Sequence, residues 1–283
     1  MAILKNLTEF SGSLGNISAY RRKDSDKVIL RMKGGATKRK IKTAKSFERT
    51  RELNAEWGGC AKAASSLRDF LVHMAPVADY NLSGSLTALA KNIQTRDLIQ
   101  PKGERAILFS KFGTILEGFQ LNKKNSFESV LRGSINVQFY AERRSVDIQL
   151  PEIIHGINFL PIGNYAAWRI VITFGSLPDL FFFDKKYGSS LDGSYRQIEK
   201  TWYSDWQFGT KNIEAQQCTI ALPVVTDSII DKKKKTTTKE LTNTSDTLAI
   251  AVGITFGTPI TDQLVKTNKY VGAGKIFKVY LPS

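Results

Sequence analysis

Apolar and polar positions alternate near the start of the chain and predict a β-hairpin of residues 17–20 and 27–32. In the second of these runs Val28, Leu30 and Met32 alternate with a mixed set of residues, so one face of the strand is apolar. Two glycines follow and end the hairpin, because glycine gives the backbone freedom without a side chain to pack. An isolated two-stranded hairpin is only marginally stable in water, so we expect this one to dock on another surface.

The next segment, residues 36–45, is basic, and its one large apolar residue is Ile41. We expect an extended arm here, because so little of the segment can be buried. Ser46 fits the N-cap of a long helix whose apolar positions recur on one face to near Pro76. Two central glycines of this helix either break it or permit the close approach of another backbone. A second helix is predicted at residues 83–95.

From residue 103 onward the sequence changes to short apolar runs separated by Gly, Pro, Asn and Asp, a pattern that is typical of antiparallel strands. Residues 134–140 and 145–150 alternate cleanly, as half-buried strands do, whereas 167–174 and 247–256 are more apolar, as central strands are. The strand candidates are 106–112, 114–121, 134–140, 145–150, 167–174, 180–184, 199–206, 215–225, 247–256 and 275–281.

The fold class that follows is α+β, with an N-terminal β-hairpin and basic arm, two helices, and then a mainly antiparallel β-sandwich or open barrel. We expect the hairpin and arm at residues 1–45, a helical region at 46–102 and a β-sandwich-like domain at 103–283. A doubly wound fold is not expected, because helices and strands do not alternate along the chain. The lysine-rich residues 231–239 are expected at the exposed tip of a long hairpin.

Composition supports an ordered globular protein. The 283 residues are 42% hydrophobic and 24% charged, as is ordinary for a globular protein, so we do not expect a disordered chain; the length allows one large or two small domains. Cys60 and Cys218 lie outside any CxxC motif, so we expect both to be reduced and buried. The start of the chain does not read as a signal peptide, and no apolar run is long enough to span a bilayer. We therefore expect a protein that is cytoplasmic, or that is in a particle released without a standard signal peptide.

The positive charge is concentrated in one segment. The net charge is +15, and residues 21–51 contain 13 Lys or Arg against three acidic residues. Such an asymmetry indicates contact with a polyanion or with an acidic partner surface. The candidate contact residues are Arg21, Arg22, Lys23, Arg31, Lys33, Lys38, Arg39, Lys40, Lys42, Lys45, Lys233 and Lys234.

The sequence contains no recognisable catalytic signature. The P-loop, GxSxG and HExxH motifs are absent. The two histidines, His73 and His155, are each flanked by apolar residues and are interpreted as structural. Asp179, Asp184 and Asp192 either supply paired carboxylates for acid–base chemistry or occupy turns at strand ends, and we favour the turns. We expect no enzymatic activity, no cofactor, no metal and no small-molecule substrate.

Three functional hypotheses remain. The favoured one is a structural subunit that self-assembles with other copies of itself into a filament, tube, shell or phage-like particle, by adding its N-terminal strands to a neighbour. The alternative is a protein that binds nucleic acid or another polyanion through residues 21–51, and the third is a monomeric binding protein whose hairpin docks on its own subunit. The residues expected at the assembly interface are Ile17, Tyr20, Val28, Leu30, Met32 and Ile41.

Short sequence patterns in both halves of the chain carry a resemblance. Glycines, aromatic residues and arginines recur at fixed places in the first part, and two Leu-Pro pairs follow in the β-rich part. These residues are Gly12, Gly15, Tyr20, Arg31, Phe47, Arg51, Trp57, Leu150, Pro151, Leu160, Pro161, Ile162 and Gly163. Through these residues the chain resembles uncharacterised β-rich proteins common in Bacteroidota, and the resemblance covers about half of its length. The resemblance implies helices followed by a β-sandwich and a bacterial source, and it assigns no site residue.

Overall fold

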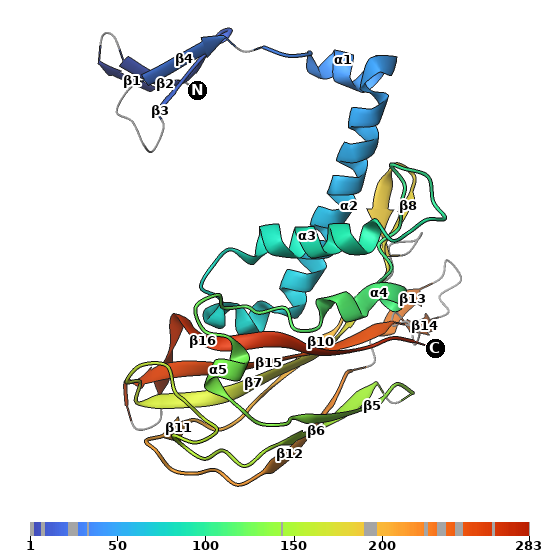
Figure 1. The fold of residues 1–283 in the computed structure, drawn as a ribbon. Helices are drawn as coiled ribbons and strands as arrows, with labels where there is room; N and C mark the ends of the chain where they lie inside the picture. The colour runs from blue at the N-terminus through green and yellow to red at the C-terminus, as the bar shows by residue number, and fades with distance from the viewer. Residues whose placement is uncertain are drawn as a thin grey trace. The chain divides into compact units, whose positions relative to one another are not determined.

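The structure is a computed structural model. It divides into two compact units, Met1–Arg51 and Glu52–Ser283, and Figure 1 shows the course of the chain through both. The residues that the structure describes are 3–6, 9–21, 28–32, 34–142, 144–189, 197–223, 226–230, 236–240, 246–261 and 264–282.

The first unit contains a four-stranded antiparallel sheet. Its strands follow one another in chain order as a meander. The last two are the predicted hairpin, which is confirmed, and the residues before it form two further strands that were not predicted. The strands are β1 (Ile3–Asn6), β2 (Glu9–Leu14), β3 (Ile17–Arg21) and β4 (Val28–Met32).

The predicted extended arm is wrong, because its centre is a short helix, α1 (Lys38–Thr43). The Thr37 hydroxyl accepts a hydrogen bond from the backbone N–H of Lys40 at 3.2 Å and so caps the first turn. At the other end the Arg51 guanidinium donates to the carbonyls of Ile41 at 2.9 Å and Ala44 at 2.8 Å. Lysine and arginine have high helix propensity, so a segment poor in apolar residues can still be helical when both ends are capped.

The long helix α2 (Glu48–Phe70) forms as expected, but its N-cap differs from the prediction. Ser46 lies inside a 3₁₀ turn, η1 (Lys45–Phe47), that runs directly into α2. A second 3₁₀ segment, η2 (Val72–Val77), continues the helical path through Pro76.

The central glycines of α2 do not break the helix. A Cβ atom on Gly59 would lie only 2.8 Å from the ring of Tyr187, so it is an aromatic ring, not another backbone, that comes close. The second predicted helix is confirmed as α3 (Leu82–Gln94), and the Asn81 side chain caps it by accepting from the Ser83 N–H.

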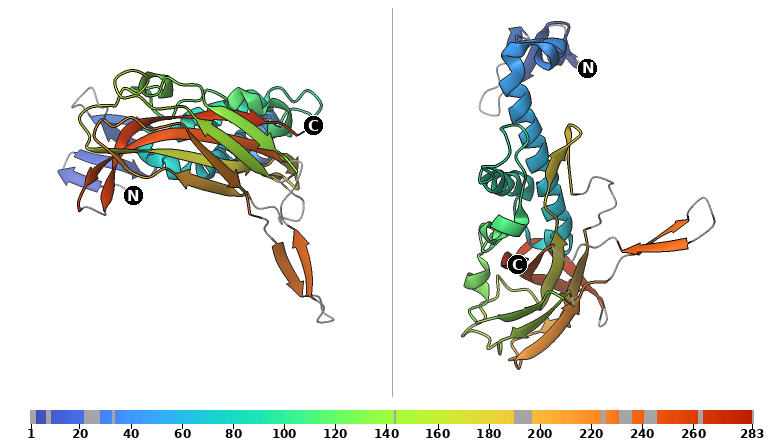
Figure 2. Two further views of the ribbon diagram at one scale, coloured as in Figure 1. Left: turned by 90° about the horizontal axis from the view of Figure 1, so that it is seen from below. Right: turned by 90° about the vertical axis from the view of Figure 1, so that its right-hand side faces the viewer.

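The second unit has three layers, which Figure 1 shows from above downward as helices, a large sheet and a small sheet. The large sheet has the strand order β10-β7-β15-β16, with β11 also paired to β7, and the small sheet has the order β12-β6-β5. Figure 2 shows the same two sheets from below (left) and from the side (right). Their strands are β5 (Asn136–Tyr140), β6 (Ser145–Leu150), β7 (Ala167–Leu177), β10 (Glu199–Tyr203), β11 (Gln207–Phe208), β12 (Gln216–Ala221), β15 (Thr247–Pro259) and β16 (Val265–Tyr280).

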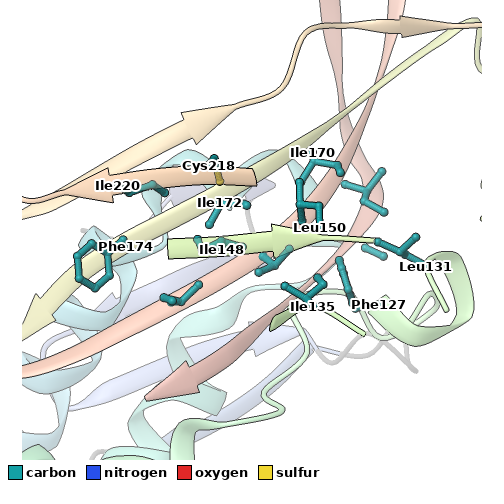
Figure 3. Close-up of a cluster of buried hydrophobic side chains, with 14 of the residues drawn as sticks. Phe127, Leu131, Ile135, Ile148, Leu150, Ile170, Ile172, Phe174, Cys218 and Ile220 are labelled. Atoms are coloured by element: carbon teal, nitrogen blue, oxygen red, sulfur yellow. The ribbon is translucent and has the colours of Figure 1, made fainter. Parts of the chain in front are cut away.

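The large sheet is buried on both faces, and its two faces belong to different cores. One core lies between the sheets, where side chains of β7 meet those of β6 and β12 (Figure 3). Ile170 and Phe174 of β7 enter this core, whereas Val171 of the same strand enters the second core, against the helices. A strand that is apolar on both faces has no alternation, which is why β7 and β15 read as dense apolar runs.

Two predicted strands of the second unit are wrong. Residues 106–112 and 114–121 form only isolated bridges, and helical turns α4 (Phe109–Phe112) and η3 (Gly113–Leu116) lie within or between them. A further turn, α5 (Phe127–Val130), follows. Short apolar runs cannot be assigned to strand or helix by periodicity alone, and here they pack as turns against the large sheet.

The other predicted strands are found close to their expected places. Two small hairpins are β8 (Phe181–Phe183) with β9 (Lys186–Gly188), and β13 (Thr226–Ile230) with β14 (Thr236–Glu240). The β13–β14 pair confirms a hairpin around the lysine-rich stretch, although residues 231–235 lie outside the described residues. The α+β class with mainly antiparallel sheets is therefore confirmed. None of the described helices has the length and apolar character needed to cross a bilayer.

Candidate assembly surface

The N-terminal sheet has one apolar face, and the strand register defines it. Leu14 lies opposite Ile17, and Ile17 lies opposite Met32. Two residues further along β3, Ala19 lies opposite Leu30. Residues directly opposite each other on paired strands project from the same face of a sheet. These five side chains therefore share a face, which we call the apolar face; Val28 continues it at the end of β4.

Most of the apolar face is open to solvent. The exposed fractions are 62% for Leu14, 42% for Ile17, 61% for Leu30 and 76% for Met32. Among the first-unit residues whose side chains are described, only Ala19 is buried. The described side chains of this sheet therefore form no hydrophobic core, which is the usual source of stability for an isolated sheet.

The opposite face of the sheet is mainly polar, although it also holds Ile29, which lies opposite the predicted interface residue Tyr20. Ser18 and Arg31 face each other there, and the guanidinium carbon of Arg31 lies 5.8 Å from the centre of the Tyr20 ring. Ile41 is half-buried in α1, so it does not belong to the sheet at all. Leu14 is the residue that the sequence reasoning missed, although the Gly-Asn turn between Leu14 and Ile17 is a hairpin signal.

The predicted cationic residues cluster on α1. Four of its six residues are Lys or Arg, and all four are exposed. Within the described part of the chain, none of these four side chains has an ion-pair partner. The exposed predicted cations are Arg21, Arg31, Lys38, Arg39, Lys40, Lys42 and Lys45, whereas Arg22, Lys23, Lys33, Lys233 and Lys234 lie outside the described residues.

No protein-family model, curated protein or solved structure matches this chain. The resemblance to β-rich proteins of Bacteroidota therefore stays a prediction, and the surfaces of the chain have to be interpreted from their own chemistry.

The residues that sequence reasoning singled out for chemistry are not brought together. His73 is exposed and accepts or donates one hydrogen bond with the Tyr203 hydroxyl at 3.2 Å, and His155 packs edge-on against Phe159. Asp179 accepts hydrogen bonds from the N–H and hydroxyl of Ser110.

The other two acidic candidates add no partner to Asp179. Asp184 lies in the turn between β8 and β9 with a φ of 48°, and Asp192 lies outside the described residues. Among the residues that the structure describes, no group of three or more His, Cys, Asp or Glu side chains is arranged to hold a metal ion.

A buried ion cluster that the sequence did not reveal surrounds Glu56 in α2, which is 1% exposed. The Arg105 guanidinium donates to both carboxylate oxygens at 2.7 Å, Lys91 donates at 2.6 Å and the Gly103 N–H at 2.9 Å. The hydrogen bond from Arg105 is the main cause that lowers the pKa of Glu56 from 4.5 to about 2, against the opposing effect of burial. The partners are far apart in sequence, so no local pattern announces them.

A second set of hydrogen bonds extends this cluster to Tyr187. The Gln94 amide donates at 3.2 Å to the Tyr187 hydroxyl and to the carbonyls of Glu56 and Arg105. The Tyr187 hydroxyl itself donates to the Arg105 carbonyl at 2.9 Å, and the Cys60 thiol donates to Gln94 at 3.3 Å. Burial raises the pKa of both Tyr187 and Cys60. This geometry favours a structural role, because each of these polar groups is already paired with another.

Another unpredicted cluster caps one end of the large sheet. The Arg169 guanidinium carbon lies 4.2 Å from the centre of the Tyr203 ring and 4.4 Å from that of the Trp206 ring. Burial lowers the pKa of Arg169. Trp206 also packs on Gly257, where a Cβ atom would lie 2.8 Å from the indole. The stacked rings stabilise the cation and cover part of the sheet, so we interpret the cluster as packing.

Proposed function

We propose that this protein is a non-enzymatic structural subunit that self-assembles through the apolar face of its N-terminal sheet. The observation that carries the proposal is that four large apolar side chains of this sheet are 42–76% exposed while only Ala19 is buried among its described side chains. A sheet that leaves its apolar face in water gains stability when a second surface covers that face.

The size of the gain bears on the kind of assembly. The exposed fractions of Leu14, Ile17, Leu30 and Met32 together equal about 2.4 fully exposed side chains. Covering them contributes roughly 4–7 kcal/mol, at about 1.5–3 kcal/mol per side chain. Because association costs about 4–15 kcal/mol, one such contact is marginal by itself. The proposal therefore requires repeated contacts, as in a filament, tube, shell or phage-like particle, where each subunit is held by more than one neighbour.

A head-to-tail contact fits this requirement best. If the apolar face met the same face of a second copy, the contact would close as a dimer. If it meets a different surface of the neighbour, each added copy offers a new apolar face and the assembly propagates. The proposal places the subunit in the cytoplasm or in a particle.

The test uses two neighbouring residues of β2 that lie on opposite faces. Leu14→Glu puts a carboxylate on the apolar face, and Ser13→Glu puts the same carboxylate on the polar face, where Ser13 is exposed. Purified wild-type protein and both variants are compared by light scattering over a range of concentrations and by negative-stain electron microscopy. We expect wild type and Ser13→Glu to form large species and Leu14→Glu to remain small.

Leu14→Glu removes about 1–2 kcal/mol of burial and adds the cost of desolvating a charge, so the association constant should fall by at least tenfold. Met32→Glu, at the most exposed position, serves as a second variant. Circular dichroism of the full-length protein confirms that the variants keep the secondary structure of the wild type. A wild-type protein that is monodisperse and monomeric at all concentrations overturns the proposal, as does assembly that Leu14→Glu leaves unchanged.

Polyanion binding is the second candidate, and the exposed cations of α1 favour it. About four phosphate contacts would give a slope of log K against log salt of roughly −3 to −4. We expect fluorescence anisotropy with labelled duplex and single-stranded DNA to show that slope. A variant in which all four Lys and Arg residues of α1 are replaced by Gln should abolish the salt dependence. A matched control neutralises four exposed lysines of the second unit, so that the net charge changes by a similar amount. The α1 positions are Lys38, Arg39, Lys40 and Lys42, and the control positions are Lys111, Lys211, Lys266 and Lys269.

If DNA binding is absent at low salt, this second candidate is wrong. If both sets of substitutions weaken binding equally, the affinity comes from total charge rather than from α1. Neither result bears on self-assembly, which is measured without nucleic acid.

A further inference from the structure

The outward face of the small sheet differs in chemistry from the rest of this basic chain. Val146, Ile148 and Leu150 of β6 point into the core between the sheets, and Figure 3 shows Ile148 and Leu150 there beside side chains of β7 and β12. Because side chains alternate along a strand, Asp147 and Gln149 point outward. The same alternation applies to the neighbouring strands, whose Phe139 and Ile220 side chains also enter that core.

The outward side chains form two polar rows across the three strands. Gln149 lies opposite Asn136 of β5 on one side and Gln217 of β12 on the other. In the next row Asp147 lies between Gln138 and Thr219. Strands are about 4.8 Å apart and alternate residues about 7 Å apart, so six polar groups form a small grid. We call the surface made by these two rows, with Tyr140 at its end, the amide face.

The amide face is hollowed and its amides are available for a ligand. A depression of about 320 Å³ is lined by residues of all three strands. The side-chain amides of Asn136, Gln138, Gln149 and Gln217 are exposed, and none of them hydrogen-bonds to another described residue. The residues that line the depression are Asn136, Val137, Gln138, Tyr140, Asp147, Gln149 and Gln217.

Charge is almost absent from these strands. The chain has 41 Lys or Arg residues, yet β5, β6 and β12 contain none, and Asp147 is their one charged residue. One oxygen of Asp147 accepts a hydrogen bond from the Thr219 hydroxyl at 2.6 Å. Solvent-facing strand positions are commonly charged or β-branched, and Asn in particular is depleted in strands, so solvation alone does not account for this selection.

We propose that the amide face binds neutral, hydroxyl-rich saccharides. A side-chain amide both donates and accepts hydrogen bonds, as each sugar hydroxyl does, and Asp147 adds an acceptor for hydroxyl donors. The depression is wide enough for sugar rings, and Tyr140 at its end offers a flat apolar surface to the C–H face of a ring. Anionic ligands are disfavoured, because the face offers no cation and one carboxylate. An extended peptide would pair with a strand edge through its backbone and would not need these side chains.

The test is saturation-transfer NMR with the full-length protein and five neutral hexasaccharides: cellohexaose, xylohexaose, maltohexaose, mannohexaose and chitohexaose. We expect transfer to at least one sugar, with a dissociation constant of about 0.1–1 mM, because an open depression leaves part of the ligand in water. Large assemblies transfer magnetisation well, so the measurement works whether or not the protein self-assembles, and its outcome is independent of the proposed assembly.

Two adjacent residues of β12 supply the matched variants. Gln217 lies on the amide face, whereas the neighbouring Gln216 is equally exposed but lies beside the pocket on the other side of the strand. Gln217→Ala and Gln149→Ala should each raise the dissociation constant about three- to tenfold, and Gln216→Ala should leave it unchanged. Circular dichroism confirms the fold of each variant. Absence of transfer to all five sugars overturns the proposal, and so does equal loss of binding in the Gln216 and Gln217 variants.

Discussion

Replacing Glu56 by Gln tests how much the buried ion cluster stabilises the second unit. The substitution keeps the size of the side chain but removes the negative charge that Arg105 and Lys91 share. It also places an amide N–H₂ group against two cationic donors. The substitution therefore resembles permanent protonation of a carboxyl that the folded protein holds ionised.

The magnitude follows from the lowered pKa. A fall from 4.5 to about 2 corresponds to about 3 kcal/mol of stability at pH 7. Because the pKa is lower in the folded state, this stability is complete above pH 4.5 and is lost as the pH falls towards 2. We therefore expect Glu56→Gln to lower the free energy of unfolding by about 3 kcal/mol at pH 7, and by about half of that amount near pH 3. At neutral pH the melting temperature should fall by roughly 6–12 °C.

Urea unfolding followed by tryptophan fluorescence measures the difference at several pH values. Glu104→Gln is the matched control, because Glu104 is exposed, lies next to Arg105 and carries the same charge. The control should change the free energy of unfolding by less than about 0.5 kcal/mol. A Glu56→Gln effect below about 1 kcal/mol at pH 7, or one that stays constant down to pH 3, would refute the reasoning.

The remaining predictions concern other buried positions. Gly59→Ala should destabilise the protein by about 1–3 kcal/mol, because its Cβ would lie 2.8 Å from the ring of Tyr187. Gly58→Ala, whose Cβ would have nothing within 4 Å, should be neutral or stabilise the protein by up to about 1 kcal/mol. Thermal unfolding of both variants measures the difference, and equal effects of the two substitutions would contradict this prediction. Burial raises the pKa of the Cys60 and Cys218 thiols to about 11, so both should react slowly with a disulfide reagent at pH 8 and rapidly in denaturant; fast labelling of the native protein contradicts this.

Local patterns predicted much of the fold. The strands β4, β5 and β6 and the helices α2 and α3 carry a periodic signal over at least five residues, and β7 and β15 are recognisable as long, continuous apolar runs. The burial of both cysteines without a disulfide is also as expected. By contrast, α1 is held by capping groups, and one of them, Arg51, lies outside the helix it caps. The composition of residues 36–45 therefore predicted an extended arm and gave no sign of the helix.

The candidate surfaces were predicted less well, because they depend on which residues lie opposite each other. The alternation of Val28, Leu30 and Met32 predicted the β4 part of the apolar face. Tyr20 falls on the other face, because β3 pairs Tyr20 with Ile29. The amide face needs the register of three strands, two of them far apart in sequence, so no window of the sequence contains it.

The pairing of β7 with β15 has a consequence for the order in which the chain acquires structure. Every residue of β7 has a partner in β15, and β15 in turn pairs with β16. The large sheet, which both cores share, therefore cannot form until these later strands have been synthesised. At about 5–20 residues per second, the ribosome needs of the order of ten seconds to make the chain between β7 and β15. The N-terminal meander has only local pairings and can form well before then. If the proposed self-assembly is correct, nascent chains on one messenger RNA would present their apolar faces to one another while their second units are still unfolded, and assembly would begin on the polysome.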